Sequence, residues 1–120
     1  MPERSPADAL RTAAKLMRER ATAATPGPWT PMALGSEGYL VLREHGTIRE
    51  RGKGRVGRFG CKDWDDDRAD AEYVASMHPL VALAVADWLD AEAASIEIYE
   101  SADADKALAV ARAYLGETDA

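Results

Sequence analysis

The run from Tyr73 to Leu89 constrains the fold most, because it is the most apolar stretch of the chain and a proline interrupts it. The residue before a proline is pushed out of the α region, whereas proline itself suits the first turn of a helix. We therefore expect His78 and Pro79 to mark a corner between two helices. The second helix carries Asp87 and is too short and too charged to span a bilayer, so we predict no membrane partner.

Apolar residues recur on the second helix at steps of three and four, which predicts one buried face. Burying a large aliphatic side chain contributes about 1.5–3 kcal/mol, and no other segment offers as many such side chains. The helix before the corner is expected to bury Tyr73, Val74 and Met77. The predicted buried face of the second helix consists of Val81, Ala84, Val85 and Trp88, widened by Leu80, Leu83 and Leu89.

A chain of 120 residues is expected to form a single domain, residues 1–120, around one core. Much of its apolar content is alanine, which favours thin helices that approach one another closely. The single cysteine, Cys61, excludes an intrachain disulfide and fits a reducing compartment. Residues 1–11 show no basic and apolar leader, so we expect a cytoplasmic protein.

The N-terminal segment 6–24 is predicted to be a helix. Ser5 is suited to cap it, the following proline fits its first turn, and Asp8 lies where an acid favours the positive end of the helix dipole. Two prolines and a glycine within residues 25–28 end the helix. Trp29 follows at once and is expected to fold back over the helix end.

The segment 29–62 contains seven of the nine glycines and short alternating apolar runs. This pattern predicts a small antiparallel β-meander. A strand at 39–42 is expected to pair with residues 30–34. A further strand is predicted at 47–49 and another at 56–59.

The acidic run 63–67 is expected to end the sheet and to favour the N-terminus of the next helix. A helix, a corner and a second helix then fill 66–94, and residues 95–100 fit either a strand or an extension of that helix. A last helix is predicted over 103–115, ended by Gly116 at a position that glycine favours.

These elements together predict an α+β fold. A small antiparallel β-meander, at about residues 30–62, is flanked by an N-terminal helix and by two or three C-terminal helices. The helical ends of the chain are expected to enclose the strands.

The net charge of −6 is distributed unevenly along the chain. Residues 43–62 carry seven Lys and Arg against two acids, whereas residues 63–120 carry three basic residues against fifteen acids. An acidic body repels phosphates, so we expect no stable binding of a nucleic acid duplex. The basic segment can meet a small polyanion, or it can pair with the acidic run beside it.

The sequence from Gly52 to Gly57 matches G-x-G-x-x-G, but no helix is expected before Asp65, which rejects a dinucleotide-binding loop. Glycine-rich backbone among arginines can still form an anion nest, and an adjacent tryptophan can stack a base. The alternatives are a solvated hairpin tip and a tryptophan that covers the core. The candidate ligand-binding residues are Arg49, Arg51, Lys53, Arg55, Arg58, Lys62 and Trp64.

Catalytic and metal-binding patterns are weak. The acids between Asp63 and Asp70 lack the spacing of a calcium-binding loop, and capping a helix is the simpler interpretation. The two histidines, His45 and His78, and Cys61 show no paired zinc-ligand spacing and no nucleophile pair. We predict no cofactor, no metal site and no catalytic residues.

Three segments form a pattern: Ala23 to Trp29 (AATPGPW), Asp70 to Pro79 (DAEYVASMHP) and Ala107 to Gly116 (ALAVARAYLG). This pattern resembles a group of short proteins from actinobacterial phages and prophages. Its first half is also similar to the Ead-like early accessory proteins of temperate phages. The resemblance covers both ends of the chain but not residues 30–66. It implies a phage accessory setting in the cytoplasm of a bacterial host and supplies no catalytic residues.

The favoured hypothesis is a non-enzymatic phage or prophage accessory binding protein, for example a counter-defence protein or an inhibitor of a host factor. An acidic face can imitate nucleic acid to such a host protein. A first alternative is sequestration of a small anionic ligand, such as a nucleotide, by the basic glycine-rich segment. A second is a metal-assisted hydrolase that uses the aspartate cluster. A spare apolar face at Tyr99, Tyr114 and Leu115 is compatible with a homo-oligomer.

Overall fold

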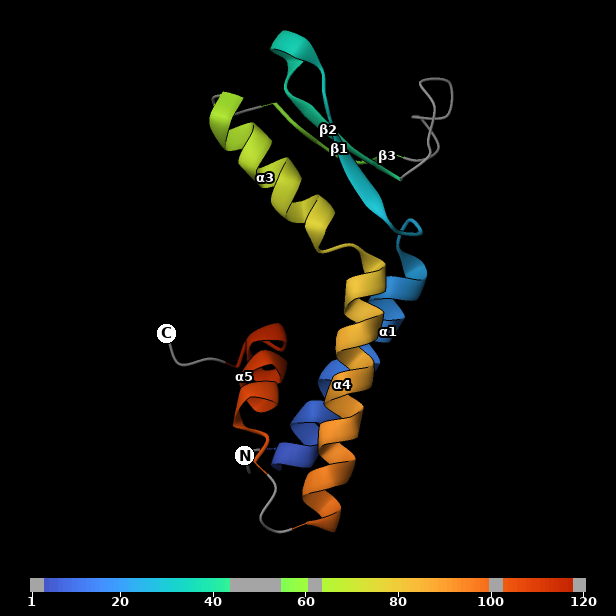
Figure 1. Ribbon diagram of the computed structural model, residues 1–120, viewed down its shortest axis with the longest axis vertical. Helices are drawn as coiled ribbons and strands as arrows, with labels where there is room; N and C mark the ends of the chain where they lie inside the picture. The colour runs from blue at the N-terminus through green and yellow to red at the C-terminus, as the bar shows by residue number, and fades with distance from the viewer. Residues whose placement is uncertain (1–3, 44–54, 61–63, 100–102, 118–120) are drawn as a thin grey trace. The chain divides into compact units, whose positions relative to one another are not determined.

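The computed structural model describes residues 4–43, 55–60, 64–99 and 103–117. These residues form an α+β fold with an N-terminal helix, a three-stranded antiparallel sheet and three helices after it, which confirms the predicted class (Figure 1). The elements in chain order are α1 (Pro6–Ala23), β1 (Trp29–Ala33), the 3₁₀ turn η1 (Gly35–Glu37), β2 (Tyr39–Arg43), β3 (Arg55–Phe59), α3 (Trp64–Ser76), α4 (Pro79–Ile98) and α5 (Asp105–Tyr114).

The chain forms two compact units. The first, which we call the helical unit, consists of Met1–Arg20 and Leu83–Ala120. The second, the sheet unit, consists of Ala21–Ala82. The predicted strand at 47–49 and the turn before it lie outside the described residues.

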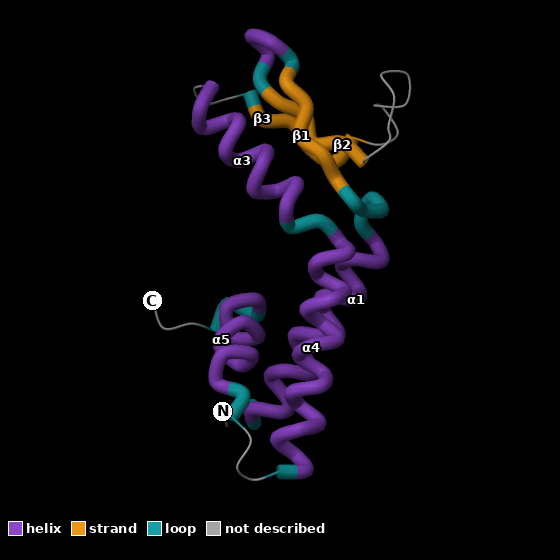
Figure 2. Tube along the Cα trace, viewed as in Figure 1, coloured by secondary structure: helices purple, strands orange, loops and turns teal. Residues whose placement is uncertain are grey.

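The sheet has the strand order β1-β2-β3, and both pairs are antiparallel (Figure 2). The central strand β2 is buried on both faces from Tyr39 to Leu42, which explains its unbroken apolar sequence. Pro31 has no N–H to donate, and it lies in β1 at the edge of this sheet, where a missing donor is tolerated.

One face of the sheet packs against α3. Tyr39 and Val41 of β2 form a buried cluster with Ala71 and Ala75 of α3. Around this cluster lie four partly buried side chains, those of Trp29, Val56, Phe59 and Val74. The two alanines let the helix lie close to the strands because they have no bulk beyond Cβ.

Trp29 turns back toward the end of α1, as the sequence predicts. Its indole N–H donates to the carbonyl of Thr25 at 2.9 Å, two residues beyond the last residue of α1. The ring also packs against the sheet cluster. Trp29 therefore ties the turn after α1 to the sheet within the sheet unit.

The corner between α3 and α4 lies at the predicted position. α3 ends at Ser76 and α4 begins at Pro79. The imidazole of His78 lies against Gly27, where an added Cβ would be 2.8 Å from Nδ1. The missing side chain at residue 27 lets the proline-rich turn after α1 approach the corner closely.

In the helical unit, α1 and α4 run antiparallel and pair through small side chains. Arg18 reaches Asp87 and Asp90, whereas the earlier Arg11 reaches the later Glu97, which sets the direction of the pairing. Within this unit, the buried residues of α1 are Ala9, Leu10, Ala13, Ala14 and Met17, and those of α4 are Ala86, Leu89 and Ala93. Ala107 and Ala111 of α5 are buried as well.

The predicted buried face of α4 is wrong in part. Leu89 is fully buried, but Leu80 is 50% exposed and Trp88 is 40% exposed. Apolar residues occur on nearly every side of α4, so periodicity does not select one face. Contact with α1 selects the alanine-rich side, since small residues allow the closest approach between helix axes.

The ends of the helices follow the expected chemistry. Ser5 Oγ accepts the Asp8 amide at the start of α1, and Asp103 Oδ1 accepts the Asp105 amide at the start of α5. Gly116 has a φ of 73° and ends α5, with the Glu117 amide donating to the Arg112 carbonyl. The residues described in the segment 95–100 extend α4 and form no strand.

Candidate functional site

Arg55 and Arg58 are the two predicted ligand-binding arginines that the structure describes, and both are exposed on β3. Residues three apart on a regular strand point to opposite faces. Here Arg58 pairs with Leu40 and Arg55 pairs with Leu42, with a register shift between them. This β-bulge accommodates one extra residue and brings both arginines to the face opposite α3.

The two guanidinium groups form no ion pair within the part of the chain that the structure describes. Arg58 Nη2 donates to the carbonyl of Glu37 at 3.3 Å, which holds this side chain across the turn before β2. Among the described residues, no carboxylate offsets either charge.

The other predicted members of this site are not placed. Arg49, Arg51, Lys53 and Lys62 lie outside the described residues, and Trp64 is described only as the first residue of α3. The structure thus brings together two of the predicted side chains, on the face of the sheet opposite α3.

The acidic run lies at the start of α3, as predicted. Asp65, Asp66 and Asp67 occupy its first turn, where acids favour the helix dipole. Asp65 lies 3.6 Å from Arg68, and Asp67 is buried and engaged in a polar interaction. Among the described residues, no group of three or more His, Cys, Asp or Glu is arranged to hold a metal ion.

Two large side chains at the end of α3, predicted from the sequence to be buried, are exposed in the structure. Tyr73 is 69% exposed and Met77 is 54% exposed, whereas Ala71 and Ala75 face the sheet. The small residues take the inner face because the helix can then approach the strands. Leu80, at the start of α4, is a further exposed apolar side chain of the sheet unit.

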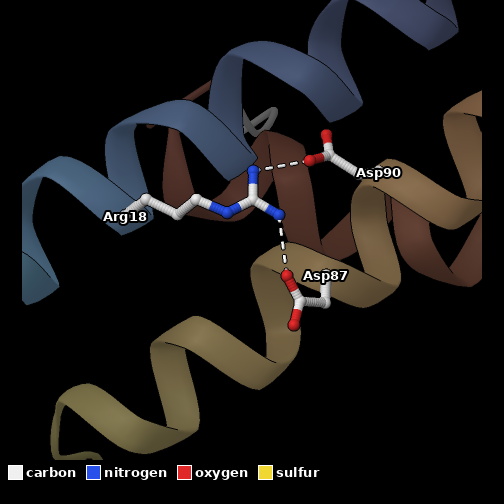
Figure 3. A network of polar contacts seen from close by, with 3 residues as sticks. All are labelled: Arg18, Asp87 and Asp90. Atoms are coloured by element: carbon white, nitrogen blue, oxygen red, sulfur yellow. Dashed lines mark hydrogen bonds and ion pairs between the residues drawn. The ribbon is translucent and has the colours of Figure 1, made fainter.

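A network of ion pairs connects α1 with α4 in the helical unit (Figure 3). Arg18 Nη2 lies 2.8 Å from Asp87 Oδ1, and Nη1 lies 2.5 Å from Asp90 Oδ2. The hydrogen bonds to Asp87 and then Asp90 raise the pKa of Arg18 above its ordinary value. These acids are occupied by a residue of the same chain, so the network stabilises the helix pair and is not a ligand site.

Glu97 gives the helical unit a pH-dependent contact. A hydrogen bond from Arg11 lowers the pKa of Glu97 below its ordinary value of 4.5. The stabilisation is therefore present above that ordinary pKa and is lost as pH falls through the lower folded-state pKa.

Glu97→Gln is expected to lower the melting temperature slightly at pH 7, because an amide does not replace the charged partner of Arg11. The difference from the wild type should disappear as pH falls below the folded-state pKa. Thermal unfolding followed by circular dichroism from pH 7 to pH 3 measures this. Glu72→Gln, at an exposed glutamate of α3, is the control and should leave the pH profile unchanged; equal effects of the two changes would contradict the assignment.

A cavity of about 300 Å³ lies in the helical unit between α4 and the start of α5. Its volume is at the lower limit of ordinary ligand pockets, about 300–1,000 Å³. Its lining combines one aromatic ring with charges of both signs: Trp88, Glu92, Asp103, Ala104, Lys106 and Ala107. The sequence analysis missed this cavity because it assigned Trp88 to the core.

None of the described helices is both long enough and apolar enough to cross a membrane. No protein-family model matches the chain, and neither does any curated protein or solved structure. The chemistry of the exposed surfaces is therefore the basis for a functional assignment.

Proposed function

We propose that this protein is a non-enzymatic accessory binding protein of a phage or prophage that binds a host protein in the bacterial cytoplasm. Its role would be counter-defence or inhibition of a host factor. The observation that carries the proposal is the exposure of two large side chains at the end of α3: Tyr73 in its last turn and Met77 just after it are both more than half exposed. The resemblance of the two ends of the chain to actinobacterial phage proteins supports the setting.

The exposed side chains at the end of α3 have the composition of a binding surface. Tyr73 lies in the last turn of α3, and Met77 lies one residue beyond the helix, where its amide donates to the Val74 carbonyl at 3.1 Å. Tyrosine and methionine are enriched in protein interfaces, and contiguous exposed apolar surface marks sites of interaction. Both side chains can be buried by a partner without disturbing the contacts of Ala71 and Ala75 with the sheet.

The charge of the chain favours a basic partner. Residues 63–120 carry fifteen acids against three basic residues, and the net charge is −6. Opposite charge steers association and excludes wrong partners. A host protein that itself binds nucleic acid presents such a basic surface, so the acidic half of this chain can compete for it.

The double change Tyr73→Ser and Met77→Ser is expected to weaken the captured complex by at least about 30-fold, since the loss of one central interface side chain alone costs about 2 kcal/mol or more. Affinity capture from an actinobacterial host followed by binding titration measures this. Val110→Ser, at an exposed apolar residue of α5, is the control. Wild-type protein that purifies alone, or two variants that bind equally well, would contradict the proposal.

A second candidate function is capture of a small anionic ligand such as a nucleotide. The bulge that puts Arg55 and Arg58 on one face of the sheet favours it. Two guanidinium groups on one face can hold phosphate oxygens with bidentate hydrogen bonds. The aspartate-based hydrolase has no comparable support among the described residues.

Excess ATP or inorganic phosphate is expected to raise the melting temperature if the arginines hold an anion, because a ligand that binds only the folded state stabilises it by about 2.7 kcal/mol at 100 times its dissociation constant. The double change Arg55→Ala and Arg58→Ala should abolish this rise. Arg68→Ala, at a surface arginine of α3, should preserve it. A thermal-shift titration distinguishes these outcomes, and no rise with the wild-type protein would exclude the second candidate.

A further inference from the structure

The cavity between α4 and the start of α5 is lined by charged side chains that do not neutralise one another. All of its lining residues belong to the helical unit. Glu92, Asp103 and Lys106 form no ion pair with any described residue. In the same unit, by contrast, Arg11 and Arg18 are paired with acids of α4. Within the part of the chain that the structure describes, the three charges of the cavity therefore lack counter-charges, which a ligand can supply.

Trp88 forms the aromatic wall of the cavity. It precedes Glu92 by four residues within α4, so the ring and this carboxylate lie on the same side of the helix, one turn apart. Ala104 and Ala107 contribute only small side chains, which leaves room beside the ring. No cation of a described residue lies over the Trp88 ring. The face of an indole attracts cations, so a cationic group of a ligand fits this wall.

The start of α5 brings one charge of each sign to the cavity. Asp103 Oδ1 accepts the Asp105 amide at 3.0 Å, and its Oδ2 has no partner among the described residues. Lys106 lies in the first turn of α5, where the helix dipole also favours a negative charge. This end of the cavity can therefore hold an ammonium group at Asp103 and a carboxylate group at Lys106.

The charges and the size of the cavity define the class of ligand. Two acids and one lysine match a molecule with two cationic groups and one anionic group. Liquid water occupies about 30 Å³ per molecule, so a cavity of about 300 Å³ has room for roughly ten non-hydrogen atoms. A free basic amino acid has this charge pattern and is close to this size. Arginine fits a tryptophan wall better than lysine, because its guanidinium group is planar, stacks on aromatic rings and binds a carboxylate through two hydrogen bonds.

We infer that the cavity between α4 and α5 binds a free basic amino acid, for which arginine is the best ligand. The guanidinium group lies over Trp88 and binds Glu92. The α-ammonium group binds Asp103, and the α-carboxylate binds Lys106. This site goes beyond the proposed binding of a host protein, because that proposal depends on the end of α3, in the sheet unit.

The first test compares three ligands by isothermal titration calorimetry of the full chain. Arginine should bind, whereas citrulline, whose urea group is neutral, should bind at least roughly tenfold more weakly, because it lacks the charge that Glu92 and Trp88 recognise. Agmatine, which has no α-carboxylate, should lose at least roughly tenfold as well, since Lys106 is then left without a partner. Citrulline or agmatine that binds as tightly as arginine, or no binding of arginine at millimolar concentrations, would overturn the inference.

The second test removes one charge at a time from the protein. Glu92→Gln and Lys106→Gln should each weaken arginine binding at least roughly tenfold. Lys106→Gln should not weaken the binding of agmatine, because this ligand has no carboxylate. Glu19→Gln and Lys15→Gln, at exposed residues of α1, are the matched controls and should leave arginine binding unchanged. Thermal unfolding verifies that each variant is folded, and a folded Glu92→Gln that binds arginine as the wild type does would refute the site.

The third test locates the ligand by the indole N–H signals in an NMR spectrum. Trp88→Phe and Trp29→Phe assign two of these signals, because each variant loses one. In the wild type, saturating arginine should shift the signal of Trp88 and leave that of Trp29, in the sheet unit, unchanged. Arginine that shifts Trp29 and not Trp88 would place the ligand elsewhere and overturn the inference.

N-acetylarginine distinguishes a free amino acid from the C-terminal residue of a peptide, because it lacks the α-ammonium group. It should bind at least roughly tenfold more weakly than arginine. Equal binding would overturn the assignment of a free amino acid and would favour a C-terminal arginine. Capture of a host protein is measured separately with the Tyr73 and Met77 changes, so the two proposals fail independently.

Discussion

Replacing Gly38 with alanine is expected to cost about 3 kcal/mol or more of unfolding free energy, from backbone strain and a backbone clash together. Gly38 precedes β2 with a φ of 97°, a region that side chains disfavour. An added Cβ would lie 2.0 Å from the carbonyl oxygen of Phe59 on the neighbouring strand. Neither atom can move without separating β2 from β3. Chemical denaturation followed by far-UV circular dichroism measures the loss.

Gly35→Ala is the matched control for this prediction. Gly35 also has a positive φ, 64°, but nothing lies within 4 Å of an added Cβ. The expected cost is therefore only that of a left-handed residue, about 1–2 kcal/mol. Equal losses at residues 35 and 38 would show that the close approach of the Phe59 carbonyl does not limit stability.

The second large effect is expected for Leu89→Ala, with a loss of about 2–5 kcal/mol. Leu89 is fully buried in the helical unit, where α4 packs against α1. Removing its side chain loses the free energy of burial and leaves a cavity between helices that the small neighbouring alanines cannot fill. Urea denaturation, with the midpoint and slope compared with the wild type, measures the change.

Leu80→Ala provides the comparison within the same helix. Leu80 is half exposed, so its truncation should cost less than about 1 kcal/mol. The two substitutions remove the same atoms and differ only in burial. A larger loss of stability at Leu80 than at Leu89 would contradict the structure and would favour the buried face of α4 that periodicity alone predicts.

The local signals in the sequence predicted the limits of the elements well. Proline after His78 placed the corner, Ser5 and Asp103 bond the amides at the starts of two helices, and Gly116 ends the last one. Each of these effects depends on a residue and its neighbours within about one turn. Such short-range chemistry is independent of what the helix later packs against.

The faces of the helices could not be predicted in the same way. Apolar periodicity predicts that Tyr73, Met77 and Trp88 are buried, and the structure exposes all three. The prediction followed side-chain size, because burying a large apolar side chain contributes most to the free energy of folding. Close approach between backbones selected the alanines instead.

In the candidate site too, the sequence identified the residues but only the tertiary structure set the direction of their side chains. The sequence identified Arg55 and Arg58 as basic residues beside glycines, but their spacing of three predicts opposite faces of a strand. Only the register shift between β2 and β3 brings both guanidinium groups to one face. A bulge depends on the pairing of two strands, and a single segment does not encode it.

The sequence alone therefore determined the α+β class, the corner between α3 and α4 and the ends of α1 and α5, because bonds within a few residues control these features. The tertiary structure decided which side of α3 and α4 is buried and which side remains open to a partner. The reason is that burial depends on how closely two backbones can approach, which is a property of both surfaces together. Tyr73 on α3 became a candidate contact residue only because the alanines of that helix face the sheet.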